Sequence, residues 1–252
     1  MAQHVSRFSR LLVAALFVLL LPPIKFSAAT DNQPPAQLSW CENAVARTLS
    51  VLPKEHIQAI HSLTLSFDPT MRRGLAGGNT LIIRCVDISE KELAAVLVHE
   101  VGHVVDTGLL HASSSDKKTS FADRGQTVYS TDPSVRLYAV SWEDNRSFTG
   151  QNIDAVSGYS LSNPYEEFAE TYAMYVLHGR LFRAYAGNNL KLDQKYRFMK
   201  NEVFDGNEYD LGPPPRRGKR EALPESTEVN RRAHRAYDVT RMDFNLESFW
   251  AL

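Results

Sequence analysis

The residues with the clearest chemical potential are His99, Glu100 and His103, which form the string His-Glu-Val-Gly-His. On a helix, residues four apart lie on one face, so both imidazoles can reach a single metal ion. Zinc binds histidine nitrogen at about 2.0–2.1 Å and favours a tetrahedral arrangement. Glu100 is turned by about 100° from its neighbour, so it can reach a zinc-activated water without being a ligand. The string therefore predicts a zinc (Zn²⁺) site with a glutamate as general base.

The surroundings of this string favour a bound metal. It lies in the apolar stretch 93–105, where two imidazoles and a carboxylate would be costly to bury without partners. A bound cation removes that cost. The alternative is a pair of core histidines, His99 and His103, that hydrogen-bond to the backbone.

A catalytic zinc site needs a third protein ligand and an open fourth position. The best sources are Glu166, Glu167 and Glu170, on a helix expected to begin at Asn163. Glu166 and Glu170 share a face, whereas Glu167 faces elsewhere. Glu166 has an alternative role as the partner of Asn163 in a helix cap. Glu170 lies one turn further on, where it can hydrogen-bond a ligand histidine or remain a solvated charge.

Asp106 follows His103 by three residues, in the last turn of the expected helix. An acidic side chain is unfavourable there because of the helix macrodipole. A specific partner would explain it, either a ligand histidine or a neighbouring loop. The alternative is an exposed aspartate at the end of the helix.

Two helices must position these side chains. The first is expected from Ser89 to about Asp106, with Ser89 and Glu92 as a capping box and Gly108 beyond its end. The second is expected from Asn163, with Pro164 in its first turn, to a stop at Gly179. Its apolar stripe predicts that one face is buried.

The rest of the chain supplies short strands and further helices. Residues 63–67 alternate apolar with polar residues, and residues 80–86 have an apolar body, so both are expected to be strands. We expect them to pair in a small antiparallel sheet. Residues 111–133 are polar and are expected to form a long loop. The fold class predicted from this pattern is α+β.

These motifs resemble the lethal-factor-like zincin metallopeptidases, which include the anthrax lethal factor catalytic domain and the secreted Pro-Pro endopeptidases. The resemblance covers roughly residues 93–178 and includes the segment 157–159 and the run 163–170. In that family a tyrosine stands seven residues before a ligand glutamate, as Tyr159 does before Glu166. The resemblance implies a zincin-like domain with an active-site helix. It also implies these site residues: His99, His103 and Glu166 as zinc ligands, Glu100 as base and Tyr159 near the metal.

The expected reaction is hydrolysis of peptide bonds in a peptide or protein substrate. Glu100 would take a proton from the zinc-activated water and pass it to the leaving amine. Tyr159 could donate a hydrogen bond to the oxyanion; its alternative is a packed loop aromatic. An edge strand holds the substrate in such zincins, and residues 80–85 are the candidate here.

The N-terminus indicates export. A basic start, the apolar run 11–21 and the small residues Ser27 to Ala29 predict a cleaved signal peptide, residues 1–29. The apolar run is too short to cross a bilayer as a helix, so no stable membrane anchor is expected after cleavage; the alternative is an uncleaved anchor. In an oxidising compartment Cys41 and Cys85 would form a disulfide; the alternative is two buried thiols.

Composition bounds the remaining possibilities. The 28 basic and 29 acidic residues nearly balance, which gives no reason to expect a nucleic-acid partner. We expect a peptidase domain at 30–212, a proline- and arginine-bearing linker at 213–236, and a C-terminal segment at 237–252 that docks on the domain. The predicted protein is a secreted or periplasmic zinc metalloendopeptidase. Two alternatives remain: a catalytically silent zincin-fold binding module, or a zinc amidohydrolase that acts on cell-wall material.

Overall fold

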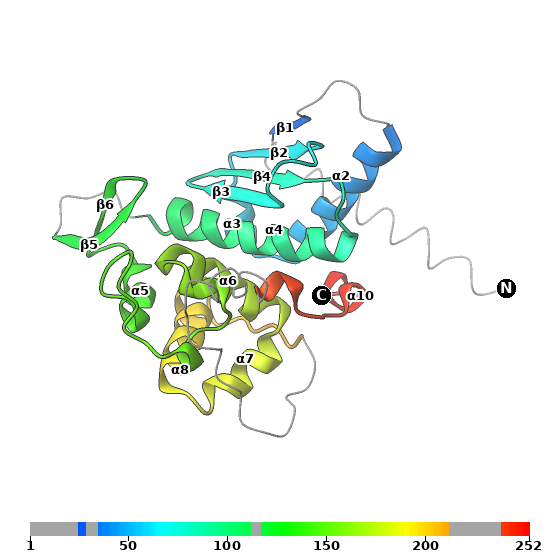
Figure 1. Ribbon diagram of the computed structural model, residues 1–252. Helices are drawn as coiled ribbons and strands as arrows, with labels where there is room; N and C mark the ends of the chain where they lie inside the picture. Colours follow the sequence, from blue (N-terminus) through cyan, green and yellow to red (C-terminus); the bar gives the residue numbers. More distant parts are fainter. Residues whose placement is uncertain (1–24, 29–34, 112–116, 212–237) are drawn as a thin grey trace.

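The computed structural model describes residues 25–28, 35–111, 117–211 and 238–252. These residues form an α+β structure with a four-stranded sheet, a two-stranded hairpin and several helices, which confirms the predicted fold class. In Figure 1 the sheet lies on one side of helix α4 (Glu90–Val104), and helices α6 (Pro164–Leu177), α7 (Gly179–Ala186) and α8 (Leu190–Phe198) lie on the other.

The sheet is mixed and not antiparallel as expected. Its order is β1-β2-β4-β3, with strands β1 (Lys25–Ala28), β2 (Ser62–Ser66), β3 (Gly74–Gly77) and β4 (Thr80–Arg84). Strands β2 and β4 pair in parallel, whereas β3 and β4 form an antiparallel hairpin. The short strand β3 lies between the two expected strands in sequence, so the chain reverses twice and brings β4 back parallel to β2.

The position of β4 corrects a second expectation. Strand β4 is bonded to β2 on one side and to β3 on the other, so residues 80–85 are not an edge strand. The edge is β3, whose sequence Gly-Leu-Ala-Gly carries no apolar alternation to mark it. A two-residue turn joins the pair, and Gly78 adopts the left-handed φ of 56° that this turn needs.

Part of the predicted domain plan falls on residues that the structure does not describe. Strand β1 lies within the predicted signal peptide 1–29 and pairs in parallel with β2, while the remainder of that segment lies outside the described residues. The expected linker 213–236 also lies outside them. Within the described ranges, no helix has the length and apolar character required to cross a bilayer.

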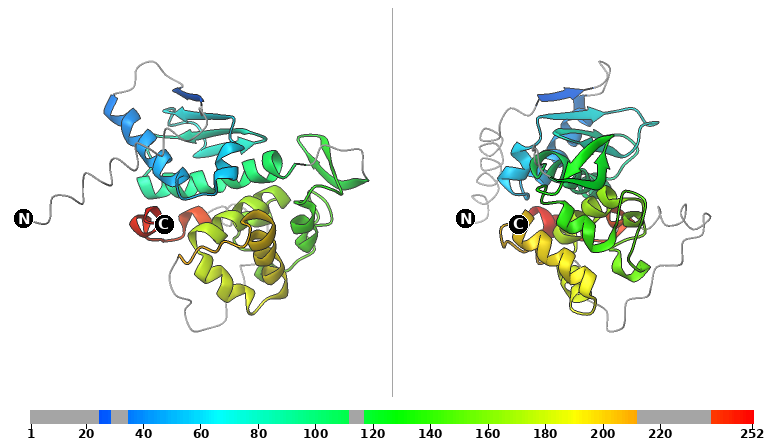
Figure 2. Two further views of the ribbon diagram at one scale, coloured as in Figure 1. Left: turned by 180° about the vertical axis from the view of Figure 1, so that it is seen from behind. Right: turned by 90° about the vertical axis from the view of Figure 1, so that its left-hand side faces the viewer.

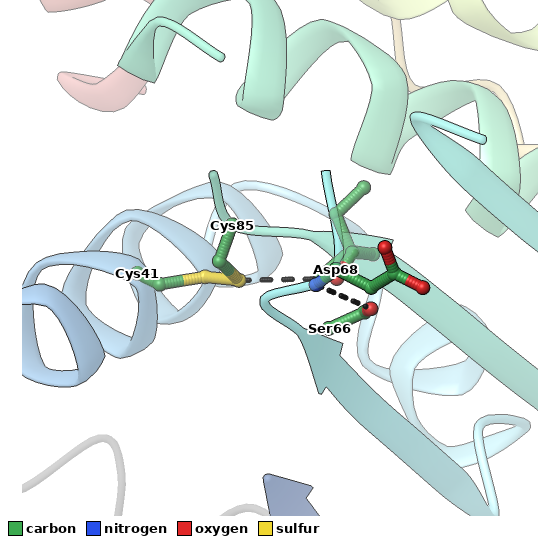
Figure 3. Close-up of a disulfide and its surroundings, with 5 residues drawn as sticks. Cys41, Ser66, Asp68 and Cys85 are labelled. Carbon is green, nitrogen blue, oxygen red and sulfur yellow. Dashed lines mark hydrogen bonds between the residues drawn. A yellow bond between two sulfur atoms is a disulfide. The ribbon is translucent and has the colours of Figure 1, made fainter. Parts of the chain in front are cut away.

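A disulfide fixes helix α2 (Pro35–Leu49) to the end of the sheet. Cys41 of α2 is bonded to Cys85, which directly follows β4, and both cysteines are buried, so the predicted pairing is confirmed (Figure 3). The bond joins residues 44 positions apart, a separation at which the chain-entropy model gives about 4 kcal/mol of stabilisation. Helix α3 (Lys54–Gln58) follows α2 and leads into β2.

Helices α4 and α6 pack closely at the level of the two histidines. Gly102 of α4 lies against Ala169 of α6, and a Cβ added at Gly102 would be 2.9 Å from the Ala169 Cα atom. Glycine is therefore required at this crossing, and it lets the histidine-bearing turn of α4 approach the first turns of α6. A π-helical turn, Val105–Leu109, ends α4.

The segment expected as a long loop contains a hairpin instead. Strands β5 (Lys118–Asp123) and β6 (Gln126–Tyr129) pair antiparallel around Arg124 and Gly125, whose φ values are 47° and 83°. Two positive φ values in succession are typical of a tight hairpin turn. Helix α5 (Val135–Ser141) and two 3₁₀ turns, Asn152–Asp154 and Tyr159–Leu161, lead from the hairpin to α6.

The C-terminal residues lie against the body of the protein. A 3₁₀ turn, Val239–Arg241, and helix α10 (Leu246–Trp250) run beside α4 and α6 in both views of Figure 2. Val239 and Phe249 are fully buried, and the Arg47 guanidinium of α2 lies 3.6 Å from the ring centroid of Trp250. A π-helical turn, Met199–Val203, follows α8.

Candidate metal centre

Helix α4 directs His99 and His103 toward one carboxylate of helix α6. The Oε2 atom of Glu166 lies 3.3 Å from the Nε2 atom of His99 and 3.3 Å from the Nε2 atom of His103. One ligand atom from each of the three residues lies within 4.8 Å of the others. The spacing of four along α4 places both imidazoles on one face, as the sequence predicted.

The donor set fits a tetrahedral metal ion. Zinc bonds of 2.0–2.1 Å put two tetrahedral ligands about 3.3 Å apart, which matches both distances from Glu166 to the imidazoles. The Glu166 Oε2 atom is buried and has no hydrogen-bond partner among the residues that the structure describes. A buried carboxylate oxygen needs a compensating positive charge. Two imidazole nitrogens and one carboxylate oxygen are also a donor set that suits zinc.

The cap of α6 leaves the Glu166 carboxylate available. Asn163 accepts hydrogen bonds from the backbone N–H groups of Tyr165 and Glu166, at 3.0 and 2.9 Å. The side chain of Glu166 turns toward the histidines and does not return to the cap. The two roles considered for this residue are thus separated: its backbone belongs to the cap and its carboxylate to the cluster.

The electrostatics of the cluster favour positive charge. Burial raises the pKa of Glu166, but the adjacent imidazoles of His103 and His99 outweigh burial and hold that pKa well below its ordinary value. Burial lowers the pKa of each imidazole, and the carboxylates around them outweigh it, so both imidazole pKa values are raised. The three side chains together attract either protons or a metal ion.

Glu170 orients the first of the two imidazoles. Its Oε1 atom lies 2.8 Å from the Nδ1 atom of His99, which leaves Nε2 facing Glu166. Its Oε2 atom accepts hydrogen bonds from the Ser157 hydroxyl and from the Val239 backbone N–H at 2.7 Å. A carboxylate fixed in this way sets the orientation and tautomer of a metal-ligating histidine.

Glu100 lies beside the cluster and against the edge strand. It is 6% exposed, and burial raises the pKa of its carboxyl group, while the positive charges of His99 and His103 oppose this effect. A Cβ added at Gly74 of β3 would lie 2.6 Å from the Glu100 Cγ atom. Only glycine leaves room for the carboxylate here, so the edge strand passes in contact with Glu100.

Tyr159 joins the cluster from the 3₁₀ turn that precedes α6. Its hydroxyl donates a hydrogen bond of 3.1 Å to the Glu166 Oε1 atom, and its ring centroid lies 6.0 Å from that of His99. Burial, followed by the nearby Glu166 carboxylate, raises the pKa of this hydroxyl, so it remains a donor at neutral pH. The hydroxyl has a single hydrogen, so it can donate to another oxygen at the cluster once it releases Glu166.

Asp106 has a partner other than a ligand histidine. It is 1% exposed, which rules out the exposed aspartate considered above. Its Oδ1 atom accepts a hydrogen bond of 2.5 Å from the Tyr138 hydroxyl on α5. In the described part of the chain it forms no hydrogen bond with His99 or His103. Its position in the π-helical turn directs the carboxylate toward α5 and away from the cluster.

Glu167 points to a different face of α6 from Glu166, as its position in the sequence suggested. Its Oε1 atom lies 2.6 Å from the Lys195 Nζ atom, and its Oε2 atom accepts a hydrogen bond of 3.0 Å from the Trp142 indole. Both Glu167 and Lys195 are fully buried. This carboxylate therefore has its own partners and takes no part in the cluster.

Three contributors to the site were not found from the sequence. Gly74 makes room for Glu100, and Val239 contributes only a backbone N–H, so neither has a side chain that signals a role. Arg73 forms ion pairs with Glu92 and Asp238 and so ties β3 to α4 and to the C-terminal segment.

The capping box expected at the start of α4 is only half formed. Ser89 caps the helix, but the Glu92 side chain forms an ion pair with Arg73 and does not return to the cap.

Known proteins offer no match to this chain: no family model, no curated protein and no solved structure matches it. What the protein does is therefore inferred from the chemistry of its own residues.

Proposed function

We propose that this protein is a zinc-dependent metalloendopeptidase of the lethal-factor-like zincin type. The observation that carries the proposal is the equal distance, 3.3 Å, from a buried, otherwise unpartnered Glu166 oxygen to the two imidazoles of the His-Glu-Val-Gly-His helix. Glu100 beside these ligands is the base that such chemistry needs. A glutamate that holds His99 through Nδ1 adds the outer contact typical of zinc-binding histidines.

When bound, zinc supplies Lewis acidity, which makes water a stronger acid and polarises a scissile carbonyl. The Glu100 carboxylate accepts the proton of the attacking water and transfers it to the leaving amine. Burial raises the pKa of this carboxyl group, and the positive charge of a zinc ion beside it would favour the ionised form that a base requires. The Tyr159 hydroxyl donates to the oxygen of the former carbonyl as negative charge develops there.

The outer edge of β3 is the surface on which an extended substrate can bind, with the peptide taking the place of Arg124 at the Ala76 carbonyl oxygen. The Arg84 N–H donates to the Arg73 carbonyl oxygen at 2.9 Å, which identifies this opposed pair as a hydrogen-bonded one. Antiparallel strands alternate such pairs with non-bonded ones, so Gly74 and Ala76 direct their N–H and C=O groups away from β4. A peptide paired with them by strand addition passes in front of Glu100.

The disulfide supports action outside the cytoplasm. Disulfides persist in secreted, periplasmic and surface proteins and are rare in reducing compartments. The Cys41–Cys85 bond belongs to the buried core, so the proposed enzyme would be more stable in an oxidising environment. We propose secretion or periplasmic location on this ground.

The proposal is tested by metal content together with peptide hydrolysis. The purified chain, reconstituted with zinc, is expected to hold about one equivalent and to cleave a synthetic peptide mixture, with cleavage abolished by a chelator. Glu100→Gln should keep the zinc and lower hydrolysis by about 10²- to 10⁴-fold, because it removes only the base. A chain that binds no zinc contradicts the site. A chain that binds zinc and cleaves no peptide contradicts the peptidase and points to a binding module.

A second test addresses Tyr159. Tyr159→Phe removes the hydroxyl that reaches the cluster while the ring remains. We expect kcat to fall by about a hundredfold with little change in KM, because the hydrogen bond strengthens as negative charge develops on the substrate oxygen. An unchanged kcat would leave Tyr159 with a packing role only.

A further inference from the structure

The cleft around the candidate metal centre combines the acidic and imidazole side chains of the cluster with a group of arginines. It has a volume of about 690 Å³, and its lining includes the histidines and glutamates of the cluster. Along and beside β3 it is lined by arginines. These are Arg72, Arg73, Arg84, Arg124 and Arg241, and the acids that line the cleft outside the cluster are Asp123 and Asp238.

Two of these arginines share one acidic residue of the cleft. Arg73 is paired with Asp238 at 2.8 Å and with Glu92 at 3.0 Å, and Arg241 lies 3.4 Å from the same Asp238 carboxylate. These contacts neutralise Asp238, the acidic residue that the C-terminal segment contributes to the cleft. They leave the charge of the remaining arginines to be balanced by something else.

The other three arginines form no ion pair within the described ranges of the chain. Arg84 donates only to the backbone carbonyls of Pro69 and Met71, and its Nε atom is buried without a partner there. Arg124, exposed at the tip of the β5–β6 hairpin, donates to the carbonyl oxygen of Ala76 at 3.4 Å. Arg72 is exposed. The exposed guanidinium groups of Arg72 and Arg124, and the remaining N–H groups of the half-buried Arg84, are available to carboxylates supplied from outside.

The three arginines lie at both ends of the edge strand. Arg72 directly precedes β3 with Arg73, and Arg84 is paired in register with Arg73 at this end. Arg124 lies over the other end, where a Cβ added at Gly77 would be 2.7 Å from its Cζ atom. Glu100 contacts β3 at Gly74, between the two groups. Along the strand, Arg72 is two positions and Gly77 is three positions from Gly74, and Arg84 is opposed to Arg73, one position away. Each position advances about 3.3 Å, so both groups lie within about three residues of the point opposite Glu100.

We propose that the substrates of this enzyme are acidic peptides, with Asp or Glu side chains two or three residues from the scissile bond that bind Arg72 and Arg84 on one side and Arg124 on the other. The inference rests on the proposed peptidase function and adds its substrate class. The planar guanidinium group binds a carboxylate through two parallel hydrogen bonds, which makes arginine selective for such side chains. Arginines gathered along one strand of a cleft also attract substrate side chains of the opposite charge.

The test compares matched peptides on the zinc-loaded full chain. A synthetic peptide mixture first identifies a cleaved sequence, and fluorogenic versions are then made with Glu, Gln or Lys two and three residues from the cut. We expect kcat/KM to be higher for the Glu peptide than for the Gln peptide by about two- to fivefold for each arginine engaged. The preference should shrink as ionic strength rises.

Variants test whether the arginines of the cleft cause the preference for Glu peptides. The double variant Arg72→Gln, Arg124→Gln should cleave the Glu and Gln peptides equally, and Arg72→Glu with Arg124→Glu should prefer the Lys peptide. Lys54→Glu is the control, because this exposed lysine lies on α3 and does not line the cleft; it should keep the preference for Glu.

Each contrary result has a distinct meaning. Equal cleavage of the Glu and Gln peptides by the unaltered chain overturns the acidic-substrate inference and leaves the peptidase function standing. A Glu preference that survives in the double Gln variant overturns the assignment to these arginines. Absence of cleavage of every peptide by the zinc-loaded chain overturns the proposed function and this inference together.

Discussion

The two faces of helix α6 hold adjacent glutamates in contrasting environments. On the face toward α8, Glu167 has a partner for each oxygen, the Lys195 ammonium and the Trp142 indole. On the face toward α4, the buried Glu166 Oε2 atom lies 3.3 Å from two imidazole nitrogens and has no hydrogen bond from the described residues. Both carboxylates are largely buried, so each requires compensation for its charge.

The difference separates a structural ion pair from the site that we propose binds a metal. Lys195 lies in the same chain and also donates to the Asp154 carbonyl, so the Glu167 charge is balanced when the protein folds. The Glu166 carboxylate faces two imidazoles instead, and either protons on these rings or a shared metal ion can balance it. Burial of a carboxylate is common to both sites, and under our proposal only the Glu166 site also takes a ligand from outside the chain.

The largest expected effect is on zinc affinity and tests whether Glu166 differs from Glu167 as a metal ligand. Glu166→Gln replaces a negatively charged ligand with a neutral amide, so zinc affinity should fall on the order of a thousandfold or more, well beyond the roughly 10- to 100-fold loss typical of an outer partner. Glu167→Gln is the matched control on the next residue and should keep its zinc. Competition with a chromogenic chelator measures both affinities. Equal zinc affinity in the Glu166→Gln variant and the unaltered chain would exclude Glu166 as a ligand.

The second effect is on stability and concerns the face that carries Glu167. Glu167→Gln leaves the buried Lys195 ammonium without its counter-charge, which should lower the free energy of unfolding by about 3–5 kcal/mol. Removing both charges, as Glu167→Met with Lys195→Met, should recover much of this loss. Urea unfolding of the zinc-loaded proteins gives the three values. A double variant less stable than Glu167→Gln would mean that the ion pair stabilises the folded protein beyond neutralising its own two buried charges.

A smaller effect concerns the contact that orients His99. Val239 is the first residue of its 3₁₀ turn, where proline is tolerated, and Asp238 before it is already extended at φ −84° and ψ 155°. Val239→Pro therefore removes the N–H donated to Glu170 with little change of the backbone. Zinc affinity should fall by about tenfold, within the range for lost outer contacts.

Val239→Ala supplies the control for this contact because it keeps the N–H and loses only side-chain packing. Its zinc affinity should match that of the unaltered chain even if its melting temperature falls. Equal zinc affinities in the Pro and Ala variants would show that the C-terminal segment packs on the site without orienting it.

The sequence predicted those parts of the site that depend on spacing within one helix. His99 and His103 are four apart, and Asn163 is a strong cap, so the two helices and the facing of their side chains could be foreseen. The disulfide followed from the presence of two cysteines and an expected oxidising compartment.

The remaining contacts depend on tertiary packing, which leaves little trace in the sequence. Strand β3 is four residues long and contains two glycines, so its pattern gave no sign that it would displace β4 from the sheet edge. Gly74 matters because Glu100 fills the space beside it, and Val239 matters through a backbone N–H that every residue except proline carries. The periodicity of apolar residues predicts which face of a helix or strand is buried, but it does not identify the residues that pack against that face.

Asp106 is a buried carboxylate in a third kind of environment. Its expected effect, on the pH dependence of stability, is the smallest of those considered. It accepts a hydrogen bond from Tyr138, while its Oδ2 atom has no partner among the described side chains and backbone groups. Burial raises its pKa to about 7, with the Ser134 and Tyr138 contacts opposing. Glu167 is paired with an ammonium and Glu166 with two imidazoles, whereas the raised pKa of Asp106 favours a protonated, uncharged carboxyl group below about pH 7.

This protonation predicts a pH dependence of stability. The unfolded chain ionises Asp106 near its ordinary pKa of about 4, whereas the folded chain retains the proton up to about pH 7, so unfolding releases a proton between these values and stability falls as pH rises. From pH 6 to pH 7 the unaltered chain should lose about 1 kcal/mol relative to Asp106→Asn, which carries no such proton. Urea unfolding of the zinc-loaded pair at both pH values measures the difference. A constant difference would mean that Asp106 is already ionised at pH 6, and the contact with Tyr138 would then be sufficient to stabilise a buried charge.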